Sequence, residues 1–141
     1  MVAREIMSEL ARLSDGPLAG ISSLAAGADQ VFAFCVLAAG GQLSFVQPAD
    51  DYRETMSGMA LRSYEHLLAL TEHVDRLPFS QSSQEAYYAA GQMVVDKCDH
   101  LLAVWDGRPA GGLGGTADIV EYAQKQGKPT TVIWPDGSGR A

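Results

Sequence analysis

The chain has 141 residues, which suits one domain built around one hydrophobic core. Hydrophobic residues make up 47% of it and charged residues 19%, and no apolar run approaches the roughly 18 residues that cross a bilayer. The net charge of −7 argues against general binding of nucleic acid, which needs a basic surface, but it permits a small anionic ligand.

Helical and extended patterns alternate along the chain. In chain order we predict helix 3–14, strand 18–22, a helix opening at 25–29 and ending before 40, strand 42–46, helix 60–72, strand 74–77, helix 84–97, strand 100–105, a helix beginning at 116 or 118 and ending at 127, and strand 130–134. This alternation predicts an α/β fold: one Rossmann-like, three-layer domain over 1–135 with a mostly parallel sheet, followed by a loose tail at 136–141.

The first predicted element is a helix, whereas a doubly wound domain normally opens with a central strand. We therefore expect the initial strand to be missing, either by design or because the true start lies upstream. Residues 1–13 fit an amphipathic helix rather than a secretory signal. Cys35 and Cys98 fall in predicted buried elements, and we interpret them as reduced thiols of a cytoplasmic protein.

The segment 106–116 holds five glycines in eleven residues, between a predicted buried strand and a predicted helix. Thr116 or Asp118 is expected to cap that helix. Open α/β sheets bind phosphate-bearing ligands at such loops, because bare backbone N–H groups and the helix dipole favour an anion. The pattern predicts a nucleotide or sugar-phosphate site, without saying whether the ligand is bound or cleaved.

Two segments resemble known families. The run DHLLAVWDG at 99–107, followed by Gly115-Thr116-Ala117 and by Tyr122-Ala123, resembles nucleoside 2-deoxyribosyltransferases. The segment GISSLAAGAD at 20–29 is similar to a loop of the SLOG superfamily, which includes cytokinin-activating phosphoribohydrolases. The resemblance implies a Rossmann-like fold and a nucleotide-derived ligand.

The motif departs from both families at the catalytic position. Each family places a nucleophilic or catalytic Glu three residues after the motif's Thr, and that position here is Ile119. Asp118 and Asp106 are the candidate catalytic carboxylates. Asp118 is alternatively a helix-start carboxylate that complements the dipole, and Asp106 alternatively forms an Asx turn with Gly107.

The other candidate residues lie in the loops that follow the predicted strands or precede the predicted helices. The predicted ligand-binding residues are Ser22, Ser23, Gly27, Asp29, Tyr52, Arg53, Ser82, Tyr87, Gly107, Gly114, Gly115 and Thr116. Arg53 suits a phosphate through its fork of donors, or forms a salt bridge with Asp50 or Asp51. Ser82 or Ser83 is expected to cap the helix 84–97.

No cofactor is expected, and the three histidines lack metal-ligand spacing with the cysteines. The first functional hypothesis is binding of a nucleotide-like small ligand in the glycine-loop site. The alternatives are an N-glycosidase acting on a nucleoside monophosphate and a non-catalytic, oligomeric interaction scaffold. A homo-oligomer is expected, because a sheet without its first strand exposes edges that favour pairing between chains.

Overall fold

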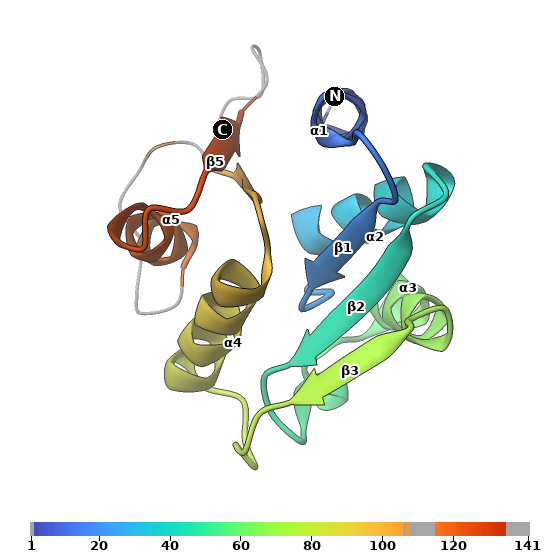
Figure 1. Cartoon of the computed structure of the whole chain (residues 1–141). Coiled ribbons are helices and arrows are strands. Elements are labelled where there is room, and N and C mark those ends of the chain that lie inside the picture. The colour runs from blue at the N-terminus through green and yellow to red at the C-terminus, as the bar shows by residue number, and fades with distance from the viewer. Residues whose placement is uncertain (1, 106, 108–114, 135–141) are drawn as a thin grey trace.

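A computed structural model describes residues 2–105, 107 and 115–134 (Figure 1). Within these residues the helices are α1 (Val2–Leu13), α2 (Ala28–Ala38), α3 (Gly58–Ala69), α4 (Gln84–Lys97) and α5 (Thr116–Lys125), with a 3-10 turn, η1 (Tyr52–Thr55). The strands are β1 (Ala19–Ser22), β2 (Gln42–Gln47), β3 (His73–Arg76), β4 (Leu101–Val104) and β5 (Thr130–Ile133). The predicted α/β class is confirmed, and the predicted tail at 136–141 lies outside the described residues.

All the described strand pairs are parallel, but they form two sheets. One has the order β1-β2-β3, with Ala19 opposite Gln42 and Ser44 opposite His73. The other pairs β4 with β5, with Leu101 opposite Thr130. Parallel strands joined through helices give the Rossmann-like layering that the alternating sequence predicts. Without a first strand, the strands predicted at 18–22 and 100–105 are expected to flank a vacancy in the sheet, to meet directly or to be completed by another chain. In the structure β1 and β4 belong to different sheets and do not pair with each other.

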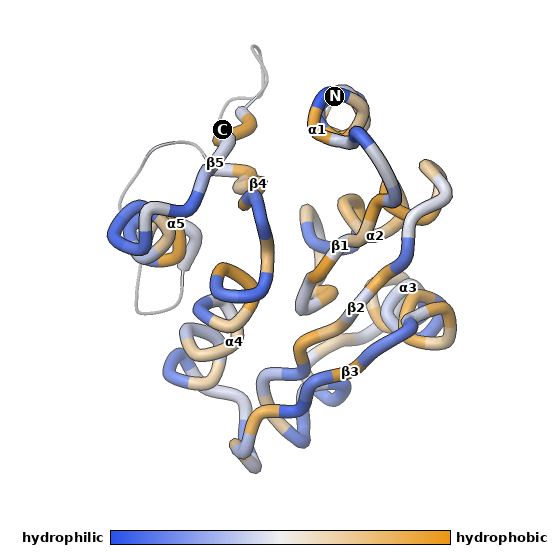
Figure 2. The backbone as a smooth tube through the Cα atoms, in the orientation of Figure 1, coloured by the Kyte–Doolittle hydropathy of each residue, from blue (hydrophilic) through white to orange (hydrophobic). Residues whose placement is uncertain are grey.

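The three-stranded sheet is covered on both faces. Leu43 and Phe45 of β2 pack with α2 and α3, whereas Val46 packs with Ala90 of α4. Successive side chains of a strand point to opposite faces, so α2 and α3 cover one face and α4 covers the other. Figure 2 shows hydrophobic residues along α2 and in the central strands.

The two-stranded sheet rests on a smaller core. Leu101 of β4 packs with Val95 of α4 and Ala123 of α5. Helix α1 reaches both halves of the molecule, because its Ile6 and Leu10 share one cluster with Cys35 and Val36 of α2 and with Ile133 of β5. The amphipathic pattern of the first thirteen residues therefore buries one stripe, as predicted.

The helix ends explain several boundaries. Ser83 caps α4, accepting a hydrogen bond at 3.1 Å from the amide of Ala86. The prediction that Thr116 or Asp118 caps α5 is wrong. The N-cap is Gly115, which has an extended backbone conformation and no side chain that could accept a hydrogen bond.

Cys35 is buried and Cys98 half-buried, and both are free thiols. Among the described residues, no helix is both long and apolar enough to cross a membrane.

Candidate functional site

A cavity of about 1040 Å³ is lined by residues of both sheets. Every residue of β1 and of β4 lines it. The loop after β1, the turn η1, and the first turns of α4 and α5 contribute further lining residues. Four chain segments that are distant in sequence therefore line one cavity.

The loop between β1 and α2 is held in one shape by its own polar groups. The Ser22 hydroxyl oxygen accepts a hydrogen bond at 3.0 Å from the amide of Leu24, and an Asp29 carboxylate oxygen accepts one at 3.3 Å from the amide of Ala25. Leu24 is fully buried and has a φ of 56°, a left-handed conformation that costs free energy unless the surroundings enforce it. The loop is thus preorganised, with Ser22, Ser23 and Asp29 facing the cavity.

A buried amide side chain ties this loop to α3. The Gln30 side-chain amide donates to the carbonyl oxygens of Leu24 at 3.2 Å and of Ala60 at 3.0 Å. A buried amide without partners is costly, so these bonds fix the loop against the helix. The sequence analysis missed both Gln30 and Leu24. The position of Gln30, a single glutamine within the largely apolar sequence of α2, was the signal that could have identified it.

Asp29 lies in an environment that disfavours its charge. Burial raises the pKa of its carboxyl group, while hydrogen bonds from the Ala25 amide and the Ser22 hydroxyl act in the opposite direction. Burial raises the pKa of the Tyr52 phenol, and the negative charge of the nearby Asp29 carboxylate raises it further. Tyr52 consequently stays neutral and can donate a hydrogen bond.

Tyr52 and Tyr87 give the cavity an aromatic wall. Their ring centroids are 6.2 Å apart in an edge-on arrangement, and Tyr52 also packs against Phe45 at 6.2 Å and Tyr64 at 5.9 Å. Tyr64 is buried on the α3 side, whereas Tyr87 on the first turn of α4 is exposed at the cavity. A planar ligand could therefore stack on a ring whose support is rigid.

The first turn of α5 also contributes to the lining of the cavity. Gly115 and Thr116 line it, and Gly115 leaves the first amides of α5 without a side-chain cap. Ile119, one turn later, also lines the cavity and packs tightly against Gly91 of α4. The position that holds a catalytic Glu in the families resembled is thus an apolar contact between two helices.

The predicted site residues divide into three groups. Those that the structure brings together around the cavity are Ser22, Ser23, Asp29, Tyr52, Tyr87, Gly115 and Thr116. Those that do not line it are Gly27, Arg53, Ser82, Gly107 and Asp118. Asp106 and Gly114 lie outside the described residues.

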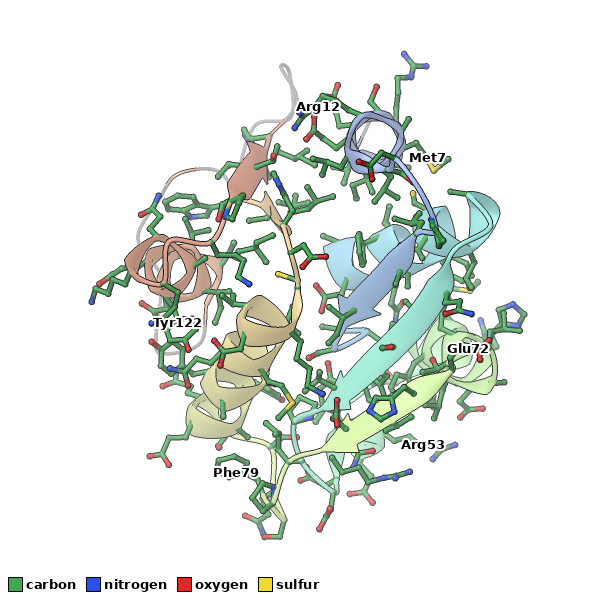
Figure 3. The ribbon with its side chains drawn as sticks, in the orientation of Figure 1. Met7, Arg12, Arg53, Glu72, Phe79 and Tyr122 are labelled. Atoms are coloured by element: carbon green, nitrogen blue, oxygen red, sulfur yellow. The ribbon has the colours of Figure 1, made fainter. Side chains whose placement is uncertain are left out.

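Two residues outside the cavity have partners of their own. Arg53 pairs with Glu65 of α3 at 2.5 Å rather than with Asp50 or Asp51, the predicted salt-bridge partners. Figure 3 shows Arg53 on the outer side of the three-stranded sheet, away from α4. The Ser82 amide and hydroxyl both donate to the Asp51 carboxylate at 2.7 Å, which fixes the entry to α4. The structure therefore gives both residues local structural contacts.

Further polar side chains line the cavity away from the loop after β1. Lys97 at the end of α4 pairs with Asp75 of β3 at 2.5 Å, and this ion pair lowers the pKa of the Asp75 carboxyl. His100 is hydrogen-bonded to Thr131 of β5 at 2.7 Å. Within the described ranges, no three His, Cys, Asp or Glu side chains are grouped closely enough to hold a metal ion.

The chain was compared with known proteins by sequence. No protein-family model matches it, and a search of curated proteins found no relative.

Proposed function

We propose that this protein binds a nucleotide or a nucleotide-derived ligand in the cavity, against the residues that the loop after β1, η1 and the first turns of α4 and α5 contribute to its lining. The observation that carries the proposal is the convergence of Ser22, Asp29, Tyr52, Tyr87 and Thr116 on one cavity. Few polar groups on a largely preformed, partly aromatic wall are typical of small-molecule sites. We further propose that the chain is a SLOG-type protein, as its glycine-containing loops suggest.

Each part of a nucleotide has a matching group in this arrangement. The exposed Tyr87 ring suits stacking against a base, and the hydroxyls of Ser22 and Ser23 suit a sugar or phosphate. The uncapped first amides of α5 suit an anion, since N–H groups at a helix start carry partial positive charge. The overall charge of −7 makes such a local donor set necessary for binding an anionic ligand.

A thermal-shift series with AMP, ADP, ADP-ribose and cyclic AMP tests the proposal, because a ligand that binds the folded state raises Tm by mass action. We expect Tyr87→Leu to abolish the shift. Tyr88→Leu is the matched control, since Tyr88 follows on the same helix and packs against Tyr122 instead of the cavity. Shifts of equal size in both variants would contradict the site.

Gly115→Val probes the anion-binding part of the site. Gly115 has a φ of −72° and a ψ of 171°, a conformation that valine adopts readily, so the substitution should leave the fold intact. Its branched side chain would stand beside the first amides of α5, and we expect nucleotide-dependent stabilisation to be lost. Unchanged nucleotide binding would show that the phosphate is held elsewhere.

N-glycoside hydrolysis is the second candidate, and one observation favours it. Asp29 lines the cavity and burial raises its pKa, which are properties of a general acid. Asp118 does not line the cavity, so Asp29 takes the acid role in this version of the proposal. Incubation with nucleoside monophosphates, followed by chromatography for free base, tests it. Base release that survives Asp29→Asn would rule out Asp29 as the acid.

Deoxyribosyl transfer is expected to be low or absent. A covalent glycosyl intermediate needs a carboxylate aimed at the anomeric carbon, and Ile119 occupies the corresponding motif position. Incubating the protein with a deoxynucleoside and an acceptor base should show no exchange. Robust exchange that survives Asp118→Ala would overturn the alignment and the catalytic role considered for Asp118.

We also propose a cytoplasmic homo-oligomer. The two free thiols support a reducing compartment. The exposed side chains of Val132 and Trp134, on and just after β5, support association between copies through that edge. Light scattering on the purified protein tests the assembly, and a stable monomer at high concentration would contradict it.

A further inference from the structure

A group of polar side chains lies on the face of the three-stranded sheet that α4 covers. Val46 of β2 packs with Ala90 of α4, so the Val46 side chain points to this face. Ser44 precedes Val46 by two residues, and alternate residues of a strand point to the same face. Ser44 is opposite His73 in the register of the sheet, and Asp75 follows His73 by two residues. Ser44, His73 and Asp75 therefore share the face of α4, and all three line the cavity.

Lys97, the last residue of α4, joins this group from the helix side. One oxygen of the Asp75 carboxylate lies 2.5 Å from Lys97 Nζ, and the other lies 3.2 Å from His73 Nε2. The hydrogen bond from Lys97 lowers the pKa of the Asp75 carboxyl, so this group stays ionised and remains an acceptor. Lys97 lines the cavity as well, so three chain elements contribute to one polar group.

Each member of the group has hydrogen-bonding capacity left for a ligand. The Lys97 ammonium uses one of its three N–H donors on Asp75, and the Asp75 carboxylate keeps further lone pairs. Among the described residues, the Ser44 hydroxyl and the Nδ1 atom of His73 have no hydrogen-bond partner. The group therefore presents free donors and free acceptors side by side at the cavity.

The charges of the lining favour a neutral, hydroxyl-rich ligand group at this place. Asp75 compensates the charge of Lys97, which is the sole lysine or arginine among the described residues that line the cavity. Asp15 and Asp99, in the loops before β1 and β4, add further carboxylates to the lining. Carboxylates repel a phosphate but accept hydrogen bonds from hydroxyls, and a hydroxyl can also accept from an ammonium. A sugar satisfies both kinds of partner, as when an acidic side chain binds the ribose of a dinucleotide.

Helices α4 and α5 show how the proposed nucleotide site is oriented. Gly91 of α4 is in close contact with Ile119 of α5. One turn later in each helix, Val95 and Ala123 belong to the same core cluster. The two helices therefore run side by side in the same direction, and their first turns lie at the same level.

The polar group is displaced from those first turns. Tyr87 and Thr116 lie in the first turns of α4 and α5, whereas Lys97 follows Tyr87 by ten residues, or about 15 Å along the axis of α4. Asp75 lies on β3, which β2 separates from β1, so it is about 10 Å from β1 across the sheet. A nucleotide bound against the first turns could reach the polar group only through an additional moiety.

We propose that Ser44, His73, Asp75 and Lys97 form a subsite for the terminal sugar of a nucleoside diphosphate sugar. The proposal rests on the proposed nucleotide site, which would hold the base and the phosphates. The sugar hydroxyls donate hydrogen bonds to Asp75 and accept them from Lys97 and Ser44. The subsite thereby selects among nucleotide derivatives by the group attached to the last phosphate.

Titration calorimetry of the full chain with ADP and with ADP-glucose tests the subsite, because the two ligands differ in the terminal sugar. We expect ADP-glucose to bind the parent at least about tenfold more tightly than ADP. Ser44→Ala and Lys97→Met should each reduce this preference to about twofold or less and leave ADP binding unchanged. The matched control is Lys125→Met, since Lys125 also ends a helix and pairs with a carboxylate, that of Glu121, but does not line the cavity.

Equal affinities of the parent for ADP and ADP-glucose would overturn the subsite and leave the nucleotide site standing. A preference for ADP-glucose that survives in both variants, or that is lost equally in Lys125→Met, would also overturn it.

A free sugar tests the subsite without the nucleotide. Methyl α-glucoside, titrated at millimolar concentration, should shift the backbone amide NMR signals of Ser44, His73 and Asp75 in the parent but not in Ser44→Ala. If neither nucleotide binds and these shifts are seen, the nucleotide site fails and the sugar subsite alone is supported. If the glucoside leaves these signals unchanged and neither nucleotide binds, both proposals are overturned.

Discussion

The two sheets differ in how well each is supported by its own core. The β1–β3 half encloses seven buried core residues, among them Leu24, Phe45 and Tyr64, between the sheet and helices α2 and α3. The β4–β5 half has three buried residues in its cluster, and Val132 and Trp134 remain 46% and 42% exposed. Apolar burial is the main source of stability, so the first half can hold a site rigid while the second depends on neighbouring helices.

This difference bears directly on the candidate site. Leu24 of the loop after β1 and Tyr52 of the aromatic wall belong to the core of the well-packed half, and Asp29 lies on α2, which covers that half. Gly115 and Thr116 come from α5, which reaches the rest of the molecule through its packing against α4. The first half therefore fixes the shape of the site, and the position of α5 completes it.

The largest effect is expected from truncating the first core. Phe45→Ala removes a fully buried ring that packs with Tyr52 and Tyr64, and it should lower the free energy of unfolding by about 3–5 kcal/mol. Leu101→Ala in the smaller cluster should cost about 2 kcal/mol, because that cluster has fewer buried neighbours to lose. Urea titration measures both, and equal losses would remove the distinction between the halves.

Filling the contact between α4 and α5 should cost less. A methyl group at Gly91 would overlap the side chain of Ile119, so Gly91→Ala should destabilise the protein by about 1–3 kcal/mol despite alanine's better helix propensity. Ile119→Ala removes the overlapping atoms. In that background Gly91→Ala should be neutral or stabilising, and a double-mutant cycle by urea unfolding checks this. Additive losses would show that the two residues do not meet.

Asp29 gives the well-packed half a distinctive pH dependence. Its pKa is raised above the usual 3.8, so ionisation is harder in the folded than in the unfolded state. The stability contributed by the protonated form is present below the unfolded pKa and is lost as pH rises through the folded pKa. The Tm of the Asp29→Asn variant minus the Tm of the parent should therefore increase as pH rises from 3.8 toward neutrality. A constant difference from pH 3.5 to 7 would show that the carboxyl titrates normally.

The smallest effect is expected at Arg53. Its ion pair with Glu65 is exposed on both sides, so Arg53→Ala should change stability by at most about 1 kcal/mol. Because Arg53 does not line the cavity, nucleotide-induced shifts in Tm should be unchanged. A large loss of nucleotide binding in this variant, measured by the same thermal-shift series, would show that Arg53 contributes to the binding site, as the sequence suggested.

The sequence by itself determined the elements and their class. The spacing of apolar residues placed α4 at residues 84–97, with Ser83 as a usable cap, and the turn residues near 16–17, 40–41 and 127 separated the remaining helices and strands. These features are local, because hydrogen bonding and side-chain periodicity within one element decide them. The loop after β1 was also identified from its local sequence, together with Ser22 and Asp29.

Tertiary structure alone decided how those elements meet. Leu24 in its left-handed conformation and the buried Gln30 depend on α3, which lies some thirty residues further along the chain. Arg53 follows a strand end, as a phosphate ligand would, yet Glu65 from another helix lies within 2.5 Å of it. For the sheets, the sequence left open whether β1 and β4 flank a vacancy, meet directly or are completed by another chain, and only the tertiary structure separates them into two sheets. Strand alternation shows that strands are parallel, but the packing of α1 and α4 between the two halves sets the space that separates β1 from β4.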